Sequence, residues 1–177
     1  MEIKYLIDKE DVITQVGGSW NDFAGSNDAP ELESTKIVGN RLWDFVQDSN
    51  TRQIYRHIVA RARTGNDAQF DFRCDAPGWR RLMKMTVVGK DDAAVEFTTQ
   101  LIDEIARPEE RILDRSLPRG KTTVTMCAWC ARLRTDSDEW HEVDSAAVRL
   151  KLFHGRKLPR LTHGVCAGCQ ELFTLDH

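Results

Sequence analysis

Two short stretches, Cys127-Ala128-Trp129-Cys130 and Cys166-Ala167-Gly168-Cys169, hold four of the five cysteines of this chain. In each stretch two residues separate the cysteines, so a tight turn places both sulfurs at two corners of a tetrahedron around one metal ion. The second pair completes the shell. The spacing therefore predicts a four-cysteine metal site that fixes the structure of the C-terminal part of the chain.

Four thiolates in a tetrahedral arrangement select zinc or iron, and we expect zinc because a structural zinc ion needs no assembly machinery. An iron-sulfur cluster held by the same cysteines is the alternative. His163 stands shortly before Cys166, and we expect it to donate a hydrogen bond to a sulfur rather than to replace a thiolate as ligand. A c-type haem requires histidine directly after a cysteine pair, and Ala131 and Gln170 occupy those positions.

The spacer between the two cysteine pairs is longer than the roughly 15 to 20 residues of an ordinary zinc ribbon, so it must fold as a small insert. Its pattern predicts a strand over 139–143, a helix that begins at Asp144 or Ser145, and a sharp turn at Gly164. A terminal helical turn is expected over 170–173. Because such a tail has little core of its own, we expect metal binding to supply much of its stability.

The composition bounds the class of protein. The chain has 177 residues, 41% of them hydrophobic, which suffices for one ordinary domain and a small appendage. A formal net charge of −3 and a pI of about 6.0 argue against nucleic-acid binding by the whole chain. The sequence contains no run of about 18 apolar residues, so it predicts no membrane-spanning helix. The first residues lack an apolar signal segment, so we expect a cytoplasmic location, where thiols stay reduced and structural disulfides are not favoured.

A basic segment in the spacer is a candidate for binding an acidic or nucleic-acid partner. Acidic residues elsewhere in the tail balance its charge, so we expect a solvated surface instead. Its members are Arg149, Lys151, His154, Arg156, Lys157 and Arg160.

The clearest change of composition falls over residues 107–121, where charged residues accompany two prolines and a glycine. We place the domain boundary there. This divides the chain into a domain over 1–106, a helical linker over 107–121 and a metal-binding element over 122–177.

Within the linker, the sequence predicts a short helix over 109–117. Pro108 suits a first helical position, and Ile112 and Leu113 fall together with Leu117 one turn on. A helix of this length is not stable alone, so we expect it to pack on the preceding domain or on a second copy of the chain.

Residues 1–106 predict an α+β domain with a five-stranded antiparallel sheet and short helices on one face. Two β-rich runs, 6–8 and 12–16, come before several short apolar helical segments. The most regular helix is expected over 51–63, with Gly65 suited to the left-handed residue that ends it. Three alternating strands follow over 69–74, 81–88 and 95–102.

This order of two strands, short helices, one longer helix and three strands resembles that of a PAS domain. Residues 19–23 resemble the aromatic helix after the second strand, 38–45 the Gly-x-x-Leu-x-Asp stretch, and 62–65 the Thr-Gly that closes the long helix. The Asp-Ile-Thr that commonly ends a PAS domain is not kept at 101–104. The resemblance implies a sensor domain with a cavity between sheet and helices, and dimerisation through this domain or the linker helix.

The tail, over residues 126–173, resembles a short cysteine-rich element that follows sensor domains in bacterial signalling proteins. The similar stretches are Met126 to Cys130, Glu139-Trp140, and Thr162 to Cys169 with its His-Gly-x-Cys-x-x-Cys string. The resemblance implies a role in signal transduction.

The side chains expected to line a PAS cavity are large and apolar, and the simplest expectation is that they fill the core without a ligand. Similar haem-binding domains use a histidine on the long helix, but His57 falls at the edge of the apolar face and is expected at the surface. The flavin-binding Asn-Cys-Arg-Phe-Leu-Gln string is absent, and Cys74 is expected to be a buried, inert thiol. The cavity ligand stays unspecified. The candidate lining residues are Trp20, Phe23, Trp43, Phe45, Ile54, Tyr55, Ile58, Phe72, Met83, Met85 and Phe97.

Together these features predict a non-enzymatic cytoplasmic signalling module, in which a PAS-like domain is joined to a zinc-stabilised element that binds a protein partner. The alternative is a redox or oxygen sensor whose four cysteines hold an iron-sulfur cluster or an oxidisable zinc-thiolate centre. A hydrolytic zinc site with His141 or His163 as a ligand is disfavoured, because four thiolates leave no open coordination position.

Overall fold

The structure, a computed structural model, describes residues 1–152 and 157–174. It divides into two compact units. The N-terminal unit comprises residues 1–71 and 83–103, and the C-terminal unit comprises 72–82 together with the chain from 104 onward. Among the described residues, no helix is both long enough and apolar enough to cross a membrane.

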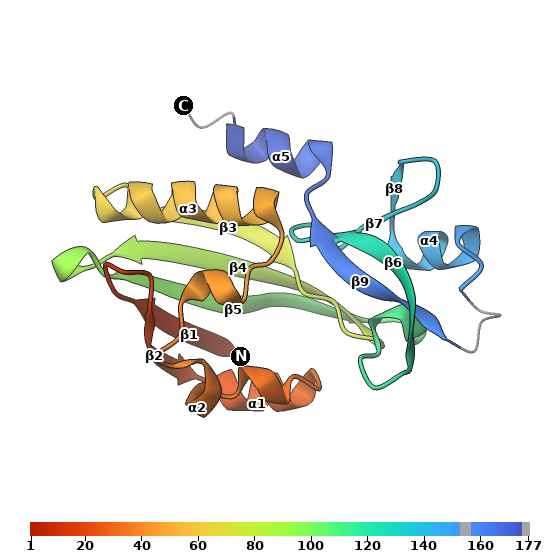
Figure 1. Cartoon of the computed structure of the whole chain (residues 1–177), viewed down its shortest axis with the longest axis horizontal. Coiled ribbons are helices and arrows are strands. Elements are labelled where there is room, and N and C mark those ends of the chain that lie inside the picture. Colours follow the sequence, from red (N-terminus) through yellow and green to blue (C-terminus); the bar gives the residue numbers. More distant parts are fainter. Residues whose placement is uncertain (153–156, 175–177) are drawn as a thin grey trace. The chain divides into compact units, whose positions relative to one another are not determined.

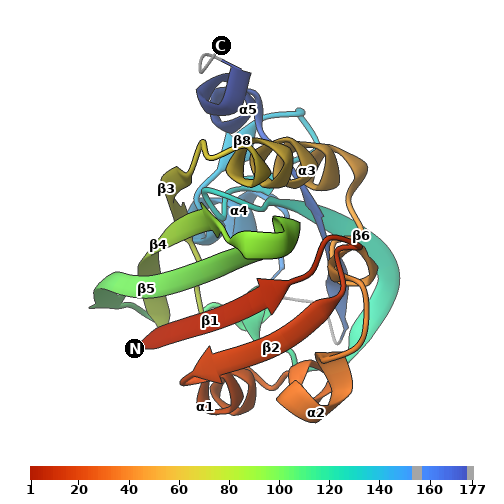
Figure 2. The ribbon, with the colours of Figure 1, turned by 90° about the vertical axis from the view of Figure 1, so that its left-hand side faces the viewer.

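One antiparallel sheet of five strands in the order β2-β1-β5-β4-β3 carries the N-terminal half of the chain (Figures 1 and 2). Its strands are β1 (Glu2–Ile7), β2 (Ile13–Gly18), β3 (Ala68–Arg73), β4 (Trp79–Gly89) and β5 (Val95–Ala106). The helices between β2 and β3 are α1 (Trp20–Ser26), η1 (Pro30–Leu32), α2 (Ser34–Ile37), η2 (Leu42–Asp44) and α3 (Ser49–Arg63), and η3 (Asp91–Ala93) joins β4 to β5.

Alternating burial along the central strands builds the core of the N-terminal unit. In β5, Val95, Phe97 and Thr99 are buried, and each faces a residue of β1 in register, as Val95 faces Ile7. Tyr5 faces Phe97, and their rings stack 4.4 Å apart and 7° from parallel. The period-2 pattern of the sequence therefore places one face of each strand in the core.

Helix α3 confirms the most regular helix of the sequence. Asp48 caps it, since its carboxylate accepts a hydrogen bond of 2.7 Å from the amide of Thr51. Ile58, Val59 and Ala62 are buried along one face. Gly65 follows with φ of 83°, as expected of the residue that ends the helix.

The C-terminal unit contains a second sheet, with four strands in the order β8-β7-β6-β9. In sequence order its elements are η4 (Arg111–Leu113), β6 (Arg119–Cys127), β7 (Leu133–Arg134), β8 (Trp140–His141), α4 (Val143–Arg149), β9 (Leu158–Gly164) and α5 (Ala167–Thr174). Strands β6 and β9 are parallel and lie side by side (Figure 1). The sequence predicted β8, α4 and α5, but neither β6 nor β9.

The C-terminal unit also has a hydrophobic core, contrary to the expectation of a tail with little core of its own. The buried members come from η4, β7, α4 and β9, so residues assigned to the linker contribute to this core. They are Ile112, Leu113, Leu133, Val143, Ala146 and Leu158.

The helix predicted over 109–117 is wrong: this stretch contains only the single 3-10 turn Arg111–Leu113. Ile112 and Leu113 are buried among residues of the C-terminal unit, 2% and 8% exposed. Ile112 and Leu113 are therefore buried by the core of the C-terminal unit and do not form the apolar face of a helix, as their spacing suggested.

That the segments 1–106 and 122–177 fold independently of each other stays a prediction. The compact units divide the chain differently, because 72–82, the end of the hairpin formed by β3 and β4, belongs to the C-terminal unit. Of the basic segment, His154 and Arg156 lie outside the described residues.

Candidate metal centre

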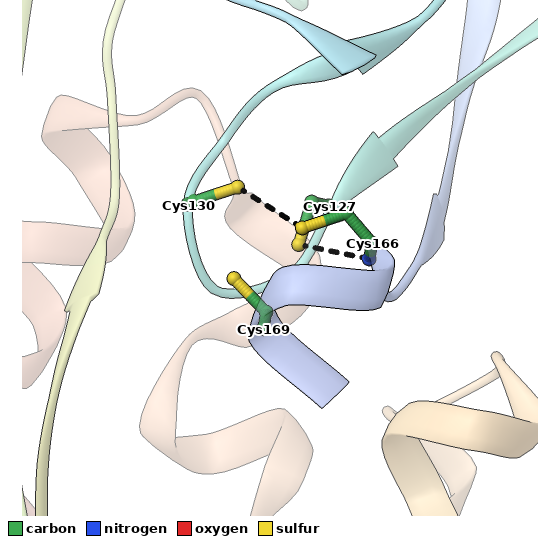
Figure 3. A group of neighbouring side chains, drawn as sticks. All are labelled: Cys127, Cys130, Cys166 and Cys169. Carbon is green, nitrogen blue, oxygen red and sulfur yellow. Dashed lines mark hydrogen bonds between the residues drawn. The ribbon is translucent and has the colours of Figure 1, made fainter. Parts of the chain in front are cut away.

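The four cysteines predicted as ligands lie together in the C-terminal unit. Their sulfur atoms all lie within 4.8 Å of one another (Figure 3). Cys127 ends β6, Cys130 lies in the turn that follows, Cys166 directly precedes α5, and Cys169 lies in its first turn. The structure therefore brings two turns that are distant in sequence to one point.

Backbone hydrogen bonds shape the first cysteine turn. The amide of Cys127 donates to the carbonyl of Arg132 at 2.8 Å, and the amide of Ala131 donates back to the carbonyl of Cys127 at 3.1 Å. Ala131 takes a φ of 57°, a left-handed conformation that is uncommon for a residue with a side chain. These bonds close a loop that presents Cys127 and Cys130 to the same side.

Two further bonds join this turn to the second one. The amide of Ala128 donates to the carbonyl of Gly164 at 2.9 Å, and the amide of Cys166 donates to the sulfur of Cys127 at 3.4 Å. Gly164 does not make the sharp turn that the sequence predicted; it ends β9, within the sheet. A Cβ atom there would lie 2.9 Å from Cγ2 of Thr125, so glycine allows β9 to approach β6 closely.

The sulfurs are mostly removed from solvent. Cys127 is 1% exposed, Cys166 6% and Cys169 8%, while Cys130 is half-buried. A hydrogen bond from the Cys130 thiol lowers the pKa of Cys127 to about 4, and that same bond raises the pKa of Cys130. Burial raises the pKa of Cys169 to about 12. The neighbouring thiol of Cys130 thus stabilises the thiolate form of Cys127.

The donor set fits a thiophilic metal ion. Zinc–sulfur bonds of about 2.3 Å make a tetrahedron with edges of about 3.8 Å. The sulfurs of Cys130 and Cys166 lie 3.7 Å apart, close to such an edge. The four cysteines are therefore positioned to bind a metal ion as zinc or as iron and sulfur.

Aromatic rings pack beside the cysteines. Trp129, inside the first turn, is 4% exposed, and its ring lies 4.7 Å from that of Phe173 in α5. This contact joins the first turn to the helix that carries Cys169, so it holds the two ligand-bearing segments together independently of any metal.

The other residues named from sequence as ligands lie outside this group. His163 is an exposed residue of β9 and is not one of the four clustered ligands. His141 lies 3.1 Å from a carboxylate oxygen of Glu139. Cys74 is not among the clustered sulfurs, and burial raises the pKa of its thiol, as expected of an inert cysteine.

The candidate cavity residues of the N-terminal half are partly confirmed as core residues. Phe45 is 38% exposed, and Phe72 is partly buried but belongs to the C-terminal unit. His57 is exposed, as expected. The buried members are Trp43, Ile58, Met83, Met85 and Phe97, and the partly buried ones are Trp20, Phe23, Ile54 and Tyr55.

Tyr5 belongs to the same aromatic group, although the sequence pattern started the first strand after it. Its ring packs against Phe97 and, 5.8 Å away, against Trp20. Burial raises the pKa of Tyr5 well above its usual value, so its phenol is neutral. A surface depression of about 520 Å³ in this unit is lined by other residues, among them Asn21, Asp28 and Glu33. Whether the aromatic group encloses a ligand cavity stays a prediction.

Sequence reasoning missed a cluster of ion pairs in the C-terminal unit. Asp75, with its side chain 1% exposed, pairs with Arg73 and Arg107. Glu142 pairs with Arg73 at 2.6 Å, with Arg132 at 3.1 Å and with Arg80 at 3.2 Å. Apart from Arg73 and Asp75, the partners are distant in sequence, so no local pattern could have indicated them.

Comparisons with known proteins identify no family for this chain. No protein-family model matches the chain, and no curated protein is similar enough to report. Among solved structures, a domain of an HTR-like protein from Haloarcula marismortui is similar at 18% sequence identity and a TM-score of 0.37. The match covers 58% of this chain and 98% of that domain, and at this TM-score it carries no argument about function.

Proposed function

We propose that this chain is a non-enzymatic signalling module, in which a PAS-like sensor domain is joined to a zinc-stabilised element that binds a protein partner. The observation that carries the proposal is the convergence of four cysteine sulfurs within 4.8 Å of one another. Four thiolates complete a tetrahedral shell, so the site serves structure rather than hydrolysis.

A single zinc ion is the occupant that this geometry favours. All four sulfurs lie within 4.8 Å of one another and one pair lies 3.7 Å apart, close to the edge of a single tetrahedron, whereas a cluster of two or four irons spreads its cysteine ligands over different metal atoms. The zinc ion would lock together the turn after β6 and the start of α5. Metal binding would thus add to the stability that the small hydrophobic core of this unit provides.

Support for a PAS-like domain comes from the order of elements. Two strands, short helices, the long helix α3 and three further strands form one antiparallel sheet, which is the order on which the resemblance rests. A sensor of this kind would respond to a ligand or partner through its sheet. The C-terminal unit would present the output surface, and a homodimer through the sensor domain is part of the same proposal.

Metal analysis and a visible spectrum of untagged protein test the proposal. We expect one zinc per chain and no visible absorbance. Cys130→Ser should lose the metal and speed amide exchange throughout the C-terminal unit, while residues 1–71 and 83–103 keep their protection. Cys74→Ser is the matched control, because this cysteine lies outside the cluster and should leave zinc binding unchanged. Protein without stoichiometric metal would end the proposal.

The second candidate function is redox or oxygen sensing by the same cysteines. The half-buried Cys130 favours it, because this residue is the most exposed of the four cysteines and a bound metal ion would hold its sulfur as a thiolate, the form that oxidants attack. Brown anaerobic protein that bleaches in air would support an iron-sulfur cluster. Colourless zinc protein that keeps its metal after treatment with peroxide would exclude both forms of this function.

A further inference from the structure

The hairpin formed by β3 and β4 ends inside the C-terminal unit, against the first cysteine turn. Arg73, the last residue of β3, donates its backbone amide to the carbonyl of Trp129 at 2.7 Å. Trp129 lies between Cys127 and Cys130. A main-chain hydrogen bond therefore connects the end of a sheet strand with the loop that carries two metal ligands.

The side chain of Arg73 adds a second connection to the same loop. Its guanidinium donates to Glu142 at 2.6 Å. The same carboxylate group accepts a hydrogen bond of 3.1 Å from Arg132, whose carbonyl receives the amide of Cys127. Arg73 thus contacts the cysteine loop at Trp129 directly and at Arg132 through Glu142.

Burial makes this arrangement rigid. Arg73 is 14% exposed and Asp75, which pairs with it, 1%. Hydrogen bonds and ion pairs are stronger in such surroundings than in water, and a planar guanidinium with two carboxylate partners has little freedom to reorient. A displacement of the cysteine loop must therefore displace Arg73 or break these bonds.

Strands β3 and β4 run from one unit into the other. Residues 68–71 of β3 and 83–89 of β4 belong to the N-terminal unit, whereas 72–82 belong to the C-terminal unit. A change in the order of residues 72–82 therefore acts on strands that continue into the sheet of the proposed sensor domain.

We propose that metal occupancy of the four cysteines is coupled to the order of the β3–β4 hairpin through Arg73 and Glu142. The inference rests on the metal site proposed above and specifies how that site communicates. Metal binding fixes the loop between Cys127 and Cys130, and the loop in turn fixes residues 72–82. Coupling of this kind is reciprocal. A ligand of the sensor domain that disturbs the hairpin changes the metal affinity by the same factor by which the metal changes the affinity for that ligand.

Hydrogen exchange of the full-length protein, with and without zinc, tests the coupling. In the wild type we expect zinc to slow amide exchange of residues 72–82 by about 5- to 150-fold, the range typical of coupled sites. Arg73→Gln should bind zinc with the same stoichiometry but lose most of the ratio between the exchange rates of residues 72–82 without and with zinc. Its zinc affinity should fall by the factor by which this ratio falls. Glu142→Gln should behave in the same way from the other side of the pair.

Arg80→Gln is the matched control. Arg80 lies in the same hairpin and contacts the Glu142 carboxylate at 3.2 Å, but its side chain is 42% exposed. The substitution removes the same positive charge as Arg73→Gln. It should keep the wild-type ratio. A merely structural role of Arg73 would speed exchange equally with and without zinc and leave the ratio unchanged, which would overturn the inference.

If zinc binds stoichiometrically but does not slow the exchange of residues 72–82, the proposed coupling is wrong and the proposed metal site is still supported. Absence of stoichiometric metal would remove the proposed function and this inference together. The two failures are therefore distinguishable.

Discussion

Replacing Asp75 by alanine tests whether the buried ion pairs determine the stability of the C-terminal unit. The Asp75 carboxylate accepts hydrogen bonds from the Arg73 side chain and from the amide of Arg81, and Arg107 lies 3.2 Å away. Arg73 and Arg107 are 14% and 11% exposed. Asp75→Ala therefore leaves two buried cations without their shared counterion.

Removing one partner of a buried ion pair costs about 3 to 5 kcal/mol, because the remaining charge stays buried and uncompensated. Arg73 retains its ion pair with Glu142, and Arg107 retains its hydrogen bond to the carbonyl of Ala76. We therefore expect about 3 kcal/mol, the lower end of the range. For a slope near 2 kcal/mol per molar urea, the unfolding midpoint should fall by about 1.5 M.

The assay is urea unfolding of the zinc-loaded protein, followed by hydrogen exchange so that each unit is observed separately. Glu104→Gln is the control: its partner Arg81 is also 14% exposed, but Glu104 itself is 32% exposed, and such pairs contribute about 0 to 1 kcal/mol. A loss below about 1 kcal/mol for Asp75→Ala, or one equal to that of Glu104→Gln, would refute the assignment of these ion pairs as stabilising.

Three further predictions concern the metal, the N-terminal unit and the second core. Zinc must displace protons from Cys130 and Cys169, whose pKa values are raised, so raising the pH by one unit should increase the zinc affinity at least about 100-fold. Competition with a chromophoric chelator at several pH values measures this affinity. Release of fewer than two protons per zinc ion, taken from the slope of log affinity against pH, contradicts the prediction. Gly89→Ala should destabilise the N-terminal unit by about 1 to 3 kcal/mol, because a Cβ there would lie 2.1 Å from the carbonyl oxygen of Ala62. Gly25→Ala, with no atom within 4 Å, is its control in thermal unfolding and should be neutral or stabilising. Leu133→Ala, at a side chain 0% exposed, should cost about 2 to 5 kcal/mol in the C-terminal unit, and an unchanged exchange rate there would show that metal alone stabilises it.

Local patterns predicted those elements whose side chains repeat regularly. The apolar face of α3 and the alternation along β5 were sufficient to place both elements, because each buries one side against a core. The cysteine pairs predicted their own convergence, since two thiolates on a tight turn cannot complete a metal shell alone.

Contacts between distant segments were not predictable in this way. Ile112 and Leu113 suggested a helix, but their burial depends on Leu133 and Val143, which come much later in the chain. Gly164 suggested a turn, although the structure requires it for close approach to Thr125. The ion pairs that join Asp75 to Arg107 and Glu142 to Arg73 were not predicted for the same reason, because charged residues carry no local signal of their partners.

The parallel pairing of β6 and β9 explains why the two cysteine pairs stand so far apart in the sequence. Parallel neighbours point the same way, so each strand delivers its cysteine turn to the same end of the sheet. The chain between them must return to the opposite end, which takes a crossover of a dozen or more residues, here including α4. Shortening this crossover to a turn of a few residues would instead give a hairpin, whose second strand runs antiparallel to β6 and carries its cysteines away from the first pair.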